Sequence, residues 1–187
     1  TKGRVLSPSN ISPKAEPPVM TPFGPGREAK LRRGRLIHLL FEALPELPSK
    51  SRKKAADAYL KRQAGLTPAD RKEMIEAALA VLEDKRFAAV FGPGGRPEAP
   101  VIGKLGDSII NGRVDRLVIT DAEILVVDYK TDRPAPPSVS EVGEAYIAQM
   151  AAYRAVLSQT WPNRPIRCLL VWTDGPRLME IPTPDLD

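Results

Sequence analysis

The spacing of apolar side chains divides the chain into a helical first part and a strand-rich second part. Across 27–44, apolar residues recur at intervals of three to six, which predicts an amphipathic helix. A second, basic helix is expected from Ser49 or Ser51 to Ala64, because serine is a favourable N-cap. A third helix is predicted over 67–82, since this segment opens on Thr-Pro, an N-cap followed by proline at the first helical position.

The second part of the chain has the two-residue period of β-strands. Three runs rich in Val, Ile and Leu are separated by hairpin-length turns: 98–105, 109–119 and 123–129. A helix over 138–158 follows, and then two further strands over 167–173 and 177–181. This order predicts an α/β fold with a mixed central sheet, built from a three-strand meander, a helix and further strands, and preceded by N-terminal helices.

The first 26 residues differ from the rest in composition. Six of the 20 prolines fall there, and the segment has no apolar periodicity. We therefore interpret 1–26 as a Pro-rich linker or tail and 27–187 as one folded domain. Composition fits a joint to a preceding domain and a frayed terminus equally well.

The distribution of charge suits a polyanionic partner. The 28 Lys and Arg against 23 Asp and Glu give a net charge of +5. Between 27 and 62 there are eleven basic and four acidic residues, so the basic charge is concentrated in the first two helices. One cluster of basic residues in the second helix is expected to contact the phosphates of a nucleic-acid backbone: Lys50, Arg52, Lys53 and Lys54.

Cysteine content and hydropathy narrow the functional classes further. The single cysteine, Cys168, excludes an internal disulfide and a four-cysteine iron–sulfur site, and it favours a cytoplasmic setting. The apolar runs are strand-sized, so we expect no membrane segment.

Two acids and a lysine at the ends of apolar strands are the best candidates for chemistry. Asp128 and Lys130 are two residues apart on one strand, so they point to the same face and Tyr129 points away. Hairpin pairing can bring Asp115 beside Asp128. Two close carboxylates repel unless a cation lies between them, and oxygen ligands suit Mg²⁺ or Mn²⁺. The simpler alternative is a surface ion pair between Lys130 and Asp128.

Four motifs in order resemble the RecB-type nuclease domain of the PD-(D/E)XK superfamily. They are Gly-Arg-Leu-Ile-His-Leu-Leu-Phe-Glu at 34–42, Gly-Arg-Val-Asp-Arg at 112–116, Asp-Tyr-Lys-Thr at 128–131 and Gln-Met-Ala-Ala-Tyr at 149–153. Within that superfamily the chain is most similar to the C-terminal nuclease domains of the AddA family of bacterial helicase-nucleases. The resemblance implies the PD-(D/E)XK nuclease fold.

The resemblance also implies roles for individual residues. It makes Asp115 and Asp128 metal ligands, together with the carbonyl of Tyr129, and it makes Lys130 the residue that orients or activates the attacking water. His38, the only histidine, matches a helical histidine that binds the same metal. Without the resemblance, a half-buried structural histidine would be the preferred interpretation.

Further residues match more peripheral motif positions. Gln149 and Tyr153 are four residues apart and share one helix face. The resemblance assigns them to contacts with DNA phosphate or to support of Lys130. Glu98 is similar to an acidic residue that precedes the first strand in relatives, where it reaches the metal or its water.

The function implied by the resemblance is a Mg²⁺-dependent deoxyribonuclease, an exonuclease in which Mn²⁺ substitutes. It would hydrolyse unwound, single-stranded DNA for a fused helicase motor, with an AddB-like partner, during double-strand break repair and recombination. The chain has no Gly-x-x-x-x-Gly-Lys-Ser/Thr loop, so ATP hydrolysis is not expected of it. Two alternatives remain: a catalytically weak nuclease-fold module that binds DNA or a partner, and a stand-alone phage or restriction-type exonuclease.

Overall fold

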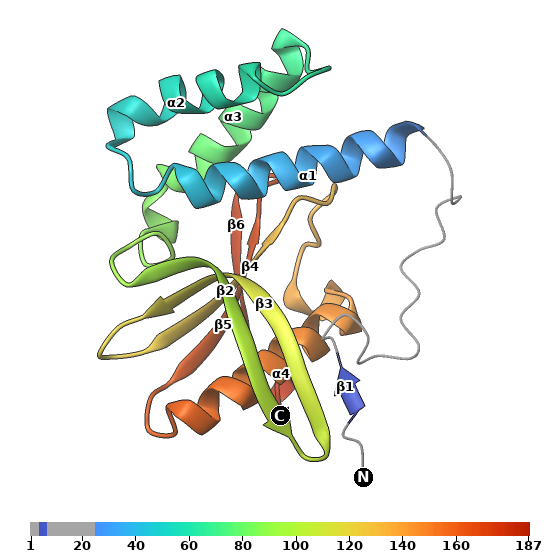
Figure 1. The fold of residues 1–187 in the computed structure, drawn as a ribbon, viewed down its shortest axis with the longest axis vertical. Helices are drawn as coiled ribbons and strands as arrows, with labels where there is room; N and C mark the ends of the chain where they lie inside the picture. Colours follow the sequence, from blue (N-terminus) through green and yellow to red (C-terminus); the bar gives the residue numbers. More distant parts are fainter. Residues whose placement is uncertain (1–3, 7–24) are drawn as a thin grey trace.

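The computed structural model describes residues 4–6 and 25–187, and within them the predicted order of helices and strands is confirmed (Figure 1). The α-helices are α1 (Pro25–Ala43), α2 (Ser49–Lys61), α3 (Pro68–Leu82) and α4 (Glu144–Thr160). The strands are β1 (Arg4–Leu6), β2 (Gly95–Leu105), β3 (Ser108–Ile119), β4 (Ile124–Lys130), β5 (Ile166–Trp172) and β6 (Arg177–Ile181). No α-helix in these described ranges is long and apolar enough to cross a membrane.

The six strands form one mixed sheet. β2, β3 and β4 are the expected antiparallel meander, β4 and β5 run parallel, and β6 returns antiparallel to β5. The parallel pair requires a crossover, which α4 supplies between β4 and β5. The α/β fold class predicted from the element order is therefore confirmed.

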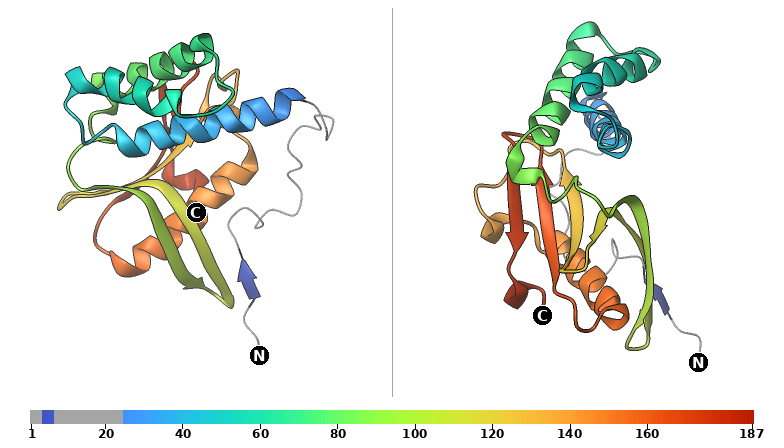
Figure 2. Two further views of the ribbon diagram at one scale, coloured as in Figure 1. Left: turned by 45° about the horizontal axis from the view of Figure 1, so that its top comes forward. Right: turned by 90° about the vertical axis from the view of Figure 1, so that its left-hand side faces the viewer.

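Helices lie against different parts of this sheet. Figure 2 shows α1, α2 and α3 gathered at one end of the molecule and α4 lying across the sheet nearer the other end. Residues on alternate faces of β4 join two separate cores: Val127 and Tyr129 pack with α1 and α3, and Val126 packs with α4. The sheet is thus covered on both faces, and its strand ends reach α1.

Local sequence signals account for most helix boundaries. Thr67 and Asp70 exchange side-chain and backbone hydrogen bonds in a capping box at the start of α3. The expected helix over 138–158 is two elements, a 3-10 turn at Val139–Glu141 and then α4, with Gly143 as the N-cap of α4. That expectation was wrong at its start because glycine favours a break before the helix.

The interpretation of 1–26 as a linker falls mostly outside the described residues. Inside it, Arg4–Leu6 forms β1, which pairs in parallel with the first residues of β3. This strand was not predicted, since three residues are too few to show a period.

Candidate active site

The candidate site lies where β3 and β4 separate beneath α1. Their ladder ends at the pair Arg116–Val127, so Asp115 and Asp128 occupy the next positions on the two strands. The backbone N–H of Tyr129 donates to Oδ2 of Asp115 at 2.6 Å. A side chain therefore replaces the backbone acceptor at this point, and the two acids are held next to each other.

Asp128 and Lys130 lie on the α4 side of the sheet, as their alternation predicts. The Lys130 ammonium forms an ion pair with Oδ2 of Asp128, and their side chains are only 10% and 15% exposed. The Nζ atom also lies 3.6 Å from the centre of the Tyr146 ring on α4. The ion pair of the simpler alternative is therefore present, but it is nearly buried and does not lie on the surface.

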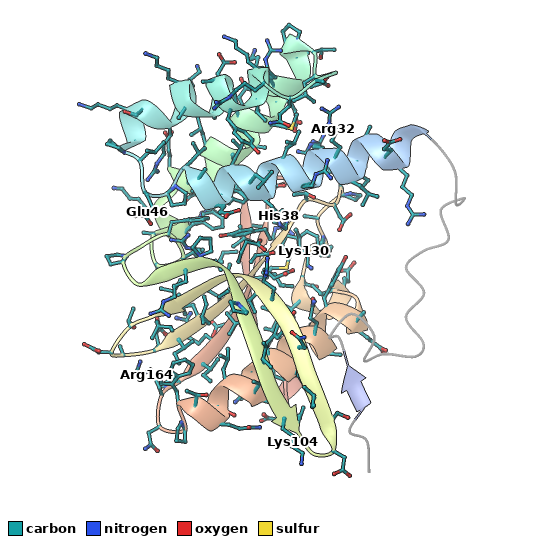
Figure 3. The ribbon with its side chains drawn as sticks, viewed as in Figure 1. Arg32, His38, Glu46, Lys104, Lys130 and Arg164 are labelled. Carbon is teal, nitrogen blue, oxygen red and sulfur yellow. The ribbon has the colours of Figure 1, made fainter. Side chains whose placement is uncertain are left out.

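His38 approaches the same acids from α1, on the other face of the sheet. Its Nδ1 is 3.5 Å from Oδ1 of Asp115, and its ring packs edge-on against Tyr129 with centroids 5.4 Å apart. The flanking positions on α1 fix this placement, since Ile37 is fully buried in the helical core. Figure 3 shows His38 and Lys130 close together at the end of the sheet that faces α1.

Burial and neighbouring charges shift the pKa values of the four ionisable groups at the site. Burial raises the pKa of Asp128 to about 6, and the charge of Asp115 adds to this effect while Lys130 opposes it. Burial alone would raise the pKa of Asp115 as well, but the hydrogen bond and charge of His38 lower it. For His38, burial is outweighed by Asp115, which raises the pKa of the imidazole. Asp128 also outweighs burial at Lys130 and raises the pKa of its ammonium.

The donor set suits a hard divalent cation. Two carboxylates and an imidazole are neighbours at this end of the sheet, and a bound cation would relieve the repulsion that contributes to the raised pKa of Asp128. In the arrangement seen here, protein cations balance the acids: His38 pairs with Asp115, and Lys130 pairs with Asp128. Among the described residues, no group of three or more His, Cys, Asp or Glu side chains is close enough to form a metal site.

Tyr153 and Gln149, the two motif residues on α4, have different surroundings in the structure. The Tyr153 hydroxyl donates to the carbonyl of Arg113 on β3 at 3.0 Å, and the residue is 2% exposed. Gln149 is half-buried one turn earlier on α4. Tyr153 thus fastens α4 to β3, and the ring that contacts Lys130 belongs to Tyr146. Sequence reasoning missed the role of Tyr146, because an aromatic–lysine contact between distant elements leaves no spacing signal.

Glu98 enters the site through an unusual backbone conformation. It lies within β2, between Pro97 paired with Arg116 and Ala99 paired with Val114, where it interrupts the ladder opposite Asp115. Its φ is +49°, a region that non-glycine residues seldom adopt. The first strand, predicted to begin at Glu98, begins three residues earlier at Gly95, so Glu98 lies inside β2.

A cavity of about 530 Å³ opens beside these groups. Its walls carry charged side chains from α1, β2 and β3, and two of these, the Glu98 carboxylate and the Arg113 guanidinium, are 3.6 Å apart. The lining residues are Arg35, His38, Leu39, Glu42, Glu98 and Arg113. Solvent and a ligand can therefore reach His38 from this side.

Comparison with known proteins agrees with the motifs. A family model for the PD-(D/E)XK nuclease superfamily matches residues 19–182. An ATP-dependent helicase/nuclease, the AddA-type chain of Oenococcus oeni (strain ATCC BAA-331 / PSU-1), is 38% identical over 72 residues, which are 38% of this chain and 6% of that protein. The chain thus matches only a small part of the length of this relative. The solved structure of SSO0001 aligns with a TM-score of 0.33 and 13% identity, over 84% of this chain and 78% of that one.

Proposed function

Because the chain belongs to the PD-(D/E)XK nuclease superfamily, we propose that it is a metal-dependent deoxyribonuclease that hydrolyses phosphodiester bonds of unwound DNA. The observation that carries the proposal is the convergence of His38, Asp115, Asp128 and Lys130, from one helix and two strands, at one end of the sheet. A buried lysine paired with a carboxylate beside a second acid is costly to maintain for stability alone. A catalytic site explains why the fold keeps it.

Each residue has a distinct task in this proposal. Asp115, Asp128 and His38, with the Tyr129 carbonyl, would hold the divalent ion, Mg²⁺ or Mn²⁺. Such an ion, when bound, acts as a Lewis acid toward the phosphate and acidifies a bound water. Beside Asp128 the raised pKa of Lys130 keeps it a cation, and once the ion neutralises that carboxylate Lys130 would turn toward the water or the phosphate oxygen.

The surrounding residues would position this set. Tyr153 anchors β3 through the Arg113 carbonyl, which keeps the strand that carries Asp115 in place. The Tyr146 ring limits where the Lys130 ammonium can move. Gln149, one turn from Tyr153 on the same helix face, would contact DNA or the site, as its motif implies.

The similarity to a helicase/nuclease protein suggests the setting. We propose that the domain acts in the cytoplasm as an exonuclease on single strands delivered by a helicase motor of the same protein. An AddB-like subunit would be its partner, and double-strand break repair and recombination would be its process. The 1–26 segment would connect the domain to that motor.

Cleavage of end-labelled DNA by the purified chain tests the proposal. With Mg²⁺ or Mn²⁺ and no nucleotide, we expect slow cleavage that favours single-stranded over blunt duplex DNA and stops in EDTA. Asp128→Asn should abolish it, because the amide cannot neutralise a cation as a carboxylate does. Asp121→Asn, the same change in the exposed turn between β3 and β4, should cleave like the wild type.

Other outcomes would point elsewhere. DNA binding without cleavage under any divalent ion would favour the catalytically weak binding module. Equal, fast cleavage of both substrates would favour a stand-alone nuclease.

A further inference from the structure

A second cavity, of about 510 Å³, lies along the N-terminal half of α1. One of its lining residues, Thr131, directly follows Lys130 in the chain. Its walls come from α1, the turn between α2 and α3, the start of α3, and the segment that follows β4. Four basic side chains and two carboxylates line it: Lys30, Arg32, Arg33, Arg133, Asp70 and Glu73. The cavity is therefore basic, and it is separate from the cavity beside His38.

Glu73 fixes two of the arginines. Its carboxylate accepts from Nε and Nη2 of Arg33 at 2.9 and 2.6 Å, and from Nη2 of Arg133 at 2.6 Å. Arg33 also donates to the carbonyl of Thr131 at 3.3 Å, so three of the five N–H donors of its guanidinium are used. These contacts join α1, α3 and the segment after β4.

The other basic groups keep donors for a ligand. Among the contacts of the described residues, Arg133 uses one of the five N–H donors of a guanidinium, and its side chain is 47% exposed. Lys30 is equally exposed and lies 3.5 Å from the carboxylate of Asp132. Arg32 donates to the carbonyl of Ala64, in the turn between α2 and α3.

The cavity adjoins Lys130 through the chain itself. Thr131, which lines the cavity, follows Lys130 in the chain. Its hydroxyl oxygen lies close to Gly34 on α1: a Cβ added at Gly34 would be 2.7 Å from that oxygen. On α1, Arg33 and His38 are five residues apart, which is about 7.5 Å along the helix. Figure 3 shows Arg32 and His38 on this helix with Lys130 beside His38.

Resting on the proposed function, we propose that this cavity binds a backbone phosphate of the substrate strand adjacent to the scissile one. Arg133 and Lys30 would contact the phosphate, and the Arg33–Glu73 pair would position Arg133. A guanidinium whose other edge is fixed is well suited to phosphate, because little side-chain freedom is lost on binding. By contrast, Arg52 in the basic α2 donates to the carbonyls of Pro45, Leu47 and Leu82, so it supports helix ends instead.

Binding of a fluorescent single-stranded oligonucleotide in EDTA, followed by anisotropy across a KCl series, tests this without any cleavage. Arg133→Ala should raise the Kd several-fold and reduce the slope of log Kd against log salt by about one. Lys30→Ala should act in the same direction. Asp70→Asn removes a negative charge from the rim and should tighten binding, a result that a misfolded variant could not give.

Matched charge changes outside the cavity are the controls. Lys104→Ala on β2 and Glu76→Gln on α3 alter exposed charges and should change Kd little. Equal effects of Lys104→Ala and Arg133→Ala, or no effect of Arg133→Ala and Lys30→Ala, would overturn the cavity assignment while cleavage by the wild type still upheld the nuclease.

The source of the phosphate is tested by competition. Inorganic phosphate should compete only weakly with the oligonucleotide for binding to the cavity. If it binds in an Arg133-dependent way while DNA binding does not depend on Arg133, the cavity is a free-phosphate site and the DNA assignment is wrong.

Discussion

The Tyr129 N–H donates to Oδ2 of Asp115 at 2.6 Å, and the other oxygen of that carboxylate lies 3.5 Å from His38. One carboxylate thus joins β3 to β4 and both strands to α1. Because the backbone fixes one oxygen, the carboxylate cannot rotate freely, and the second oxygen has a defined direction. The end of the strand ladder therefore creates the site, since the position lost to pairing is taken by a side chain.

The raised pKa of Asp128 predicts an inverted pH dependence of stability in the metal-free protein. The folded pKa is about 6 against 3.8 for the unperturbed group, so the folded state binds this proton more tightly. The stability that the proton supplies is present below about pH 4 and lost as the pH rises through about 6. Asp128→Asn should therefore gain stability relative to the wild type from about pH 4 to 7, on the order of 3 kcal/mol.

Urea unfolding in EDTA at several pH values measures this difference. The variant Asp121→Asn, in an exposed turn, should track the wild type at every pH. Parallel curves for Asp128→Asn and the wild type would show that the Asp128 carboxyl titrates normally in the folded protein.

Gly34 should be intolerant of a side chain although it lies inside a helix. Alanine normally stabilises a helix interior over glycine by about 1 kcal/mol. Here the new Cβ would stand 2.7 Å from the Thr131 hydroxyl, so Gly34→Ala should lower the melting temperature and slow cleavage by shifting the segment after Lys130. Adding Thr131→Ala should restore much of both, because it removes the hydroxyl that the Cβ meets.

The control for this pair is Gly26→Ala near the start of the same helix. A Cβ at Gly26 meets nothing within 4 Å, so the melting temperature should hold or rise. A stabilising Gly34→Ala, or a double variant no better than the single one, would mean that the close approach is not a constraint.

The order of elements and the shared face of Asp128 and Lys130 could be predicted from the sequence because both follow from short-range periods. Alternation along β4 put the two residues on one face, and the structure agrees. The family motifs, in agreement with the match over 19–182, brought His38 to the same site. Periodicity alone could not do this, since the contact of His38 with Asp115 spans two distant elements.

Other features depend on tertiary geometry and escaped the sequence. The positive φ of Glu98 arises where β2 skips a pairing position, and a glutamate gives no sign of such a conformation. The cavity around Glu73 joins segments far apart in the chain: Arg33 donates to the carbonyl of Thr131, 98 residues later. The expectation that Arg52 follows phosphates together with the lysines of α2 was wrong for its guanidinium, which donates to three carbonyls.

Tyr153→Phe should separate a structural role from a DNA contact. The buried hydroxyl donates to the Arg113 carbonyl at 3.0 Å, so its loss should cost about 1 kcal/mol of unfolding free energy in urea. Cleavage should slow several-fold, because β3 carries Asp115, while the Kd for oligonucleotide in EDTA should not change. Tyr59→Phe, on a half-buried ring of α2, controls for the chemical change alone. A weaker Kd with unchanged stability would instead show that the hydroxyl leaves Arg113 and contacts the DNA.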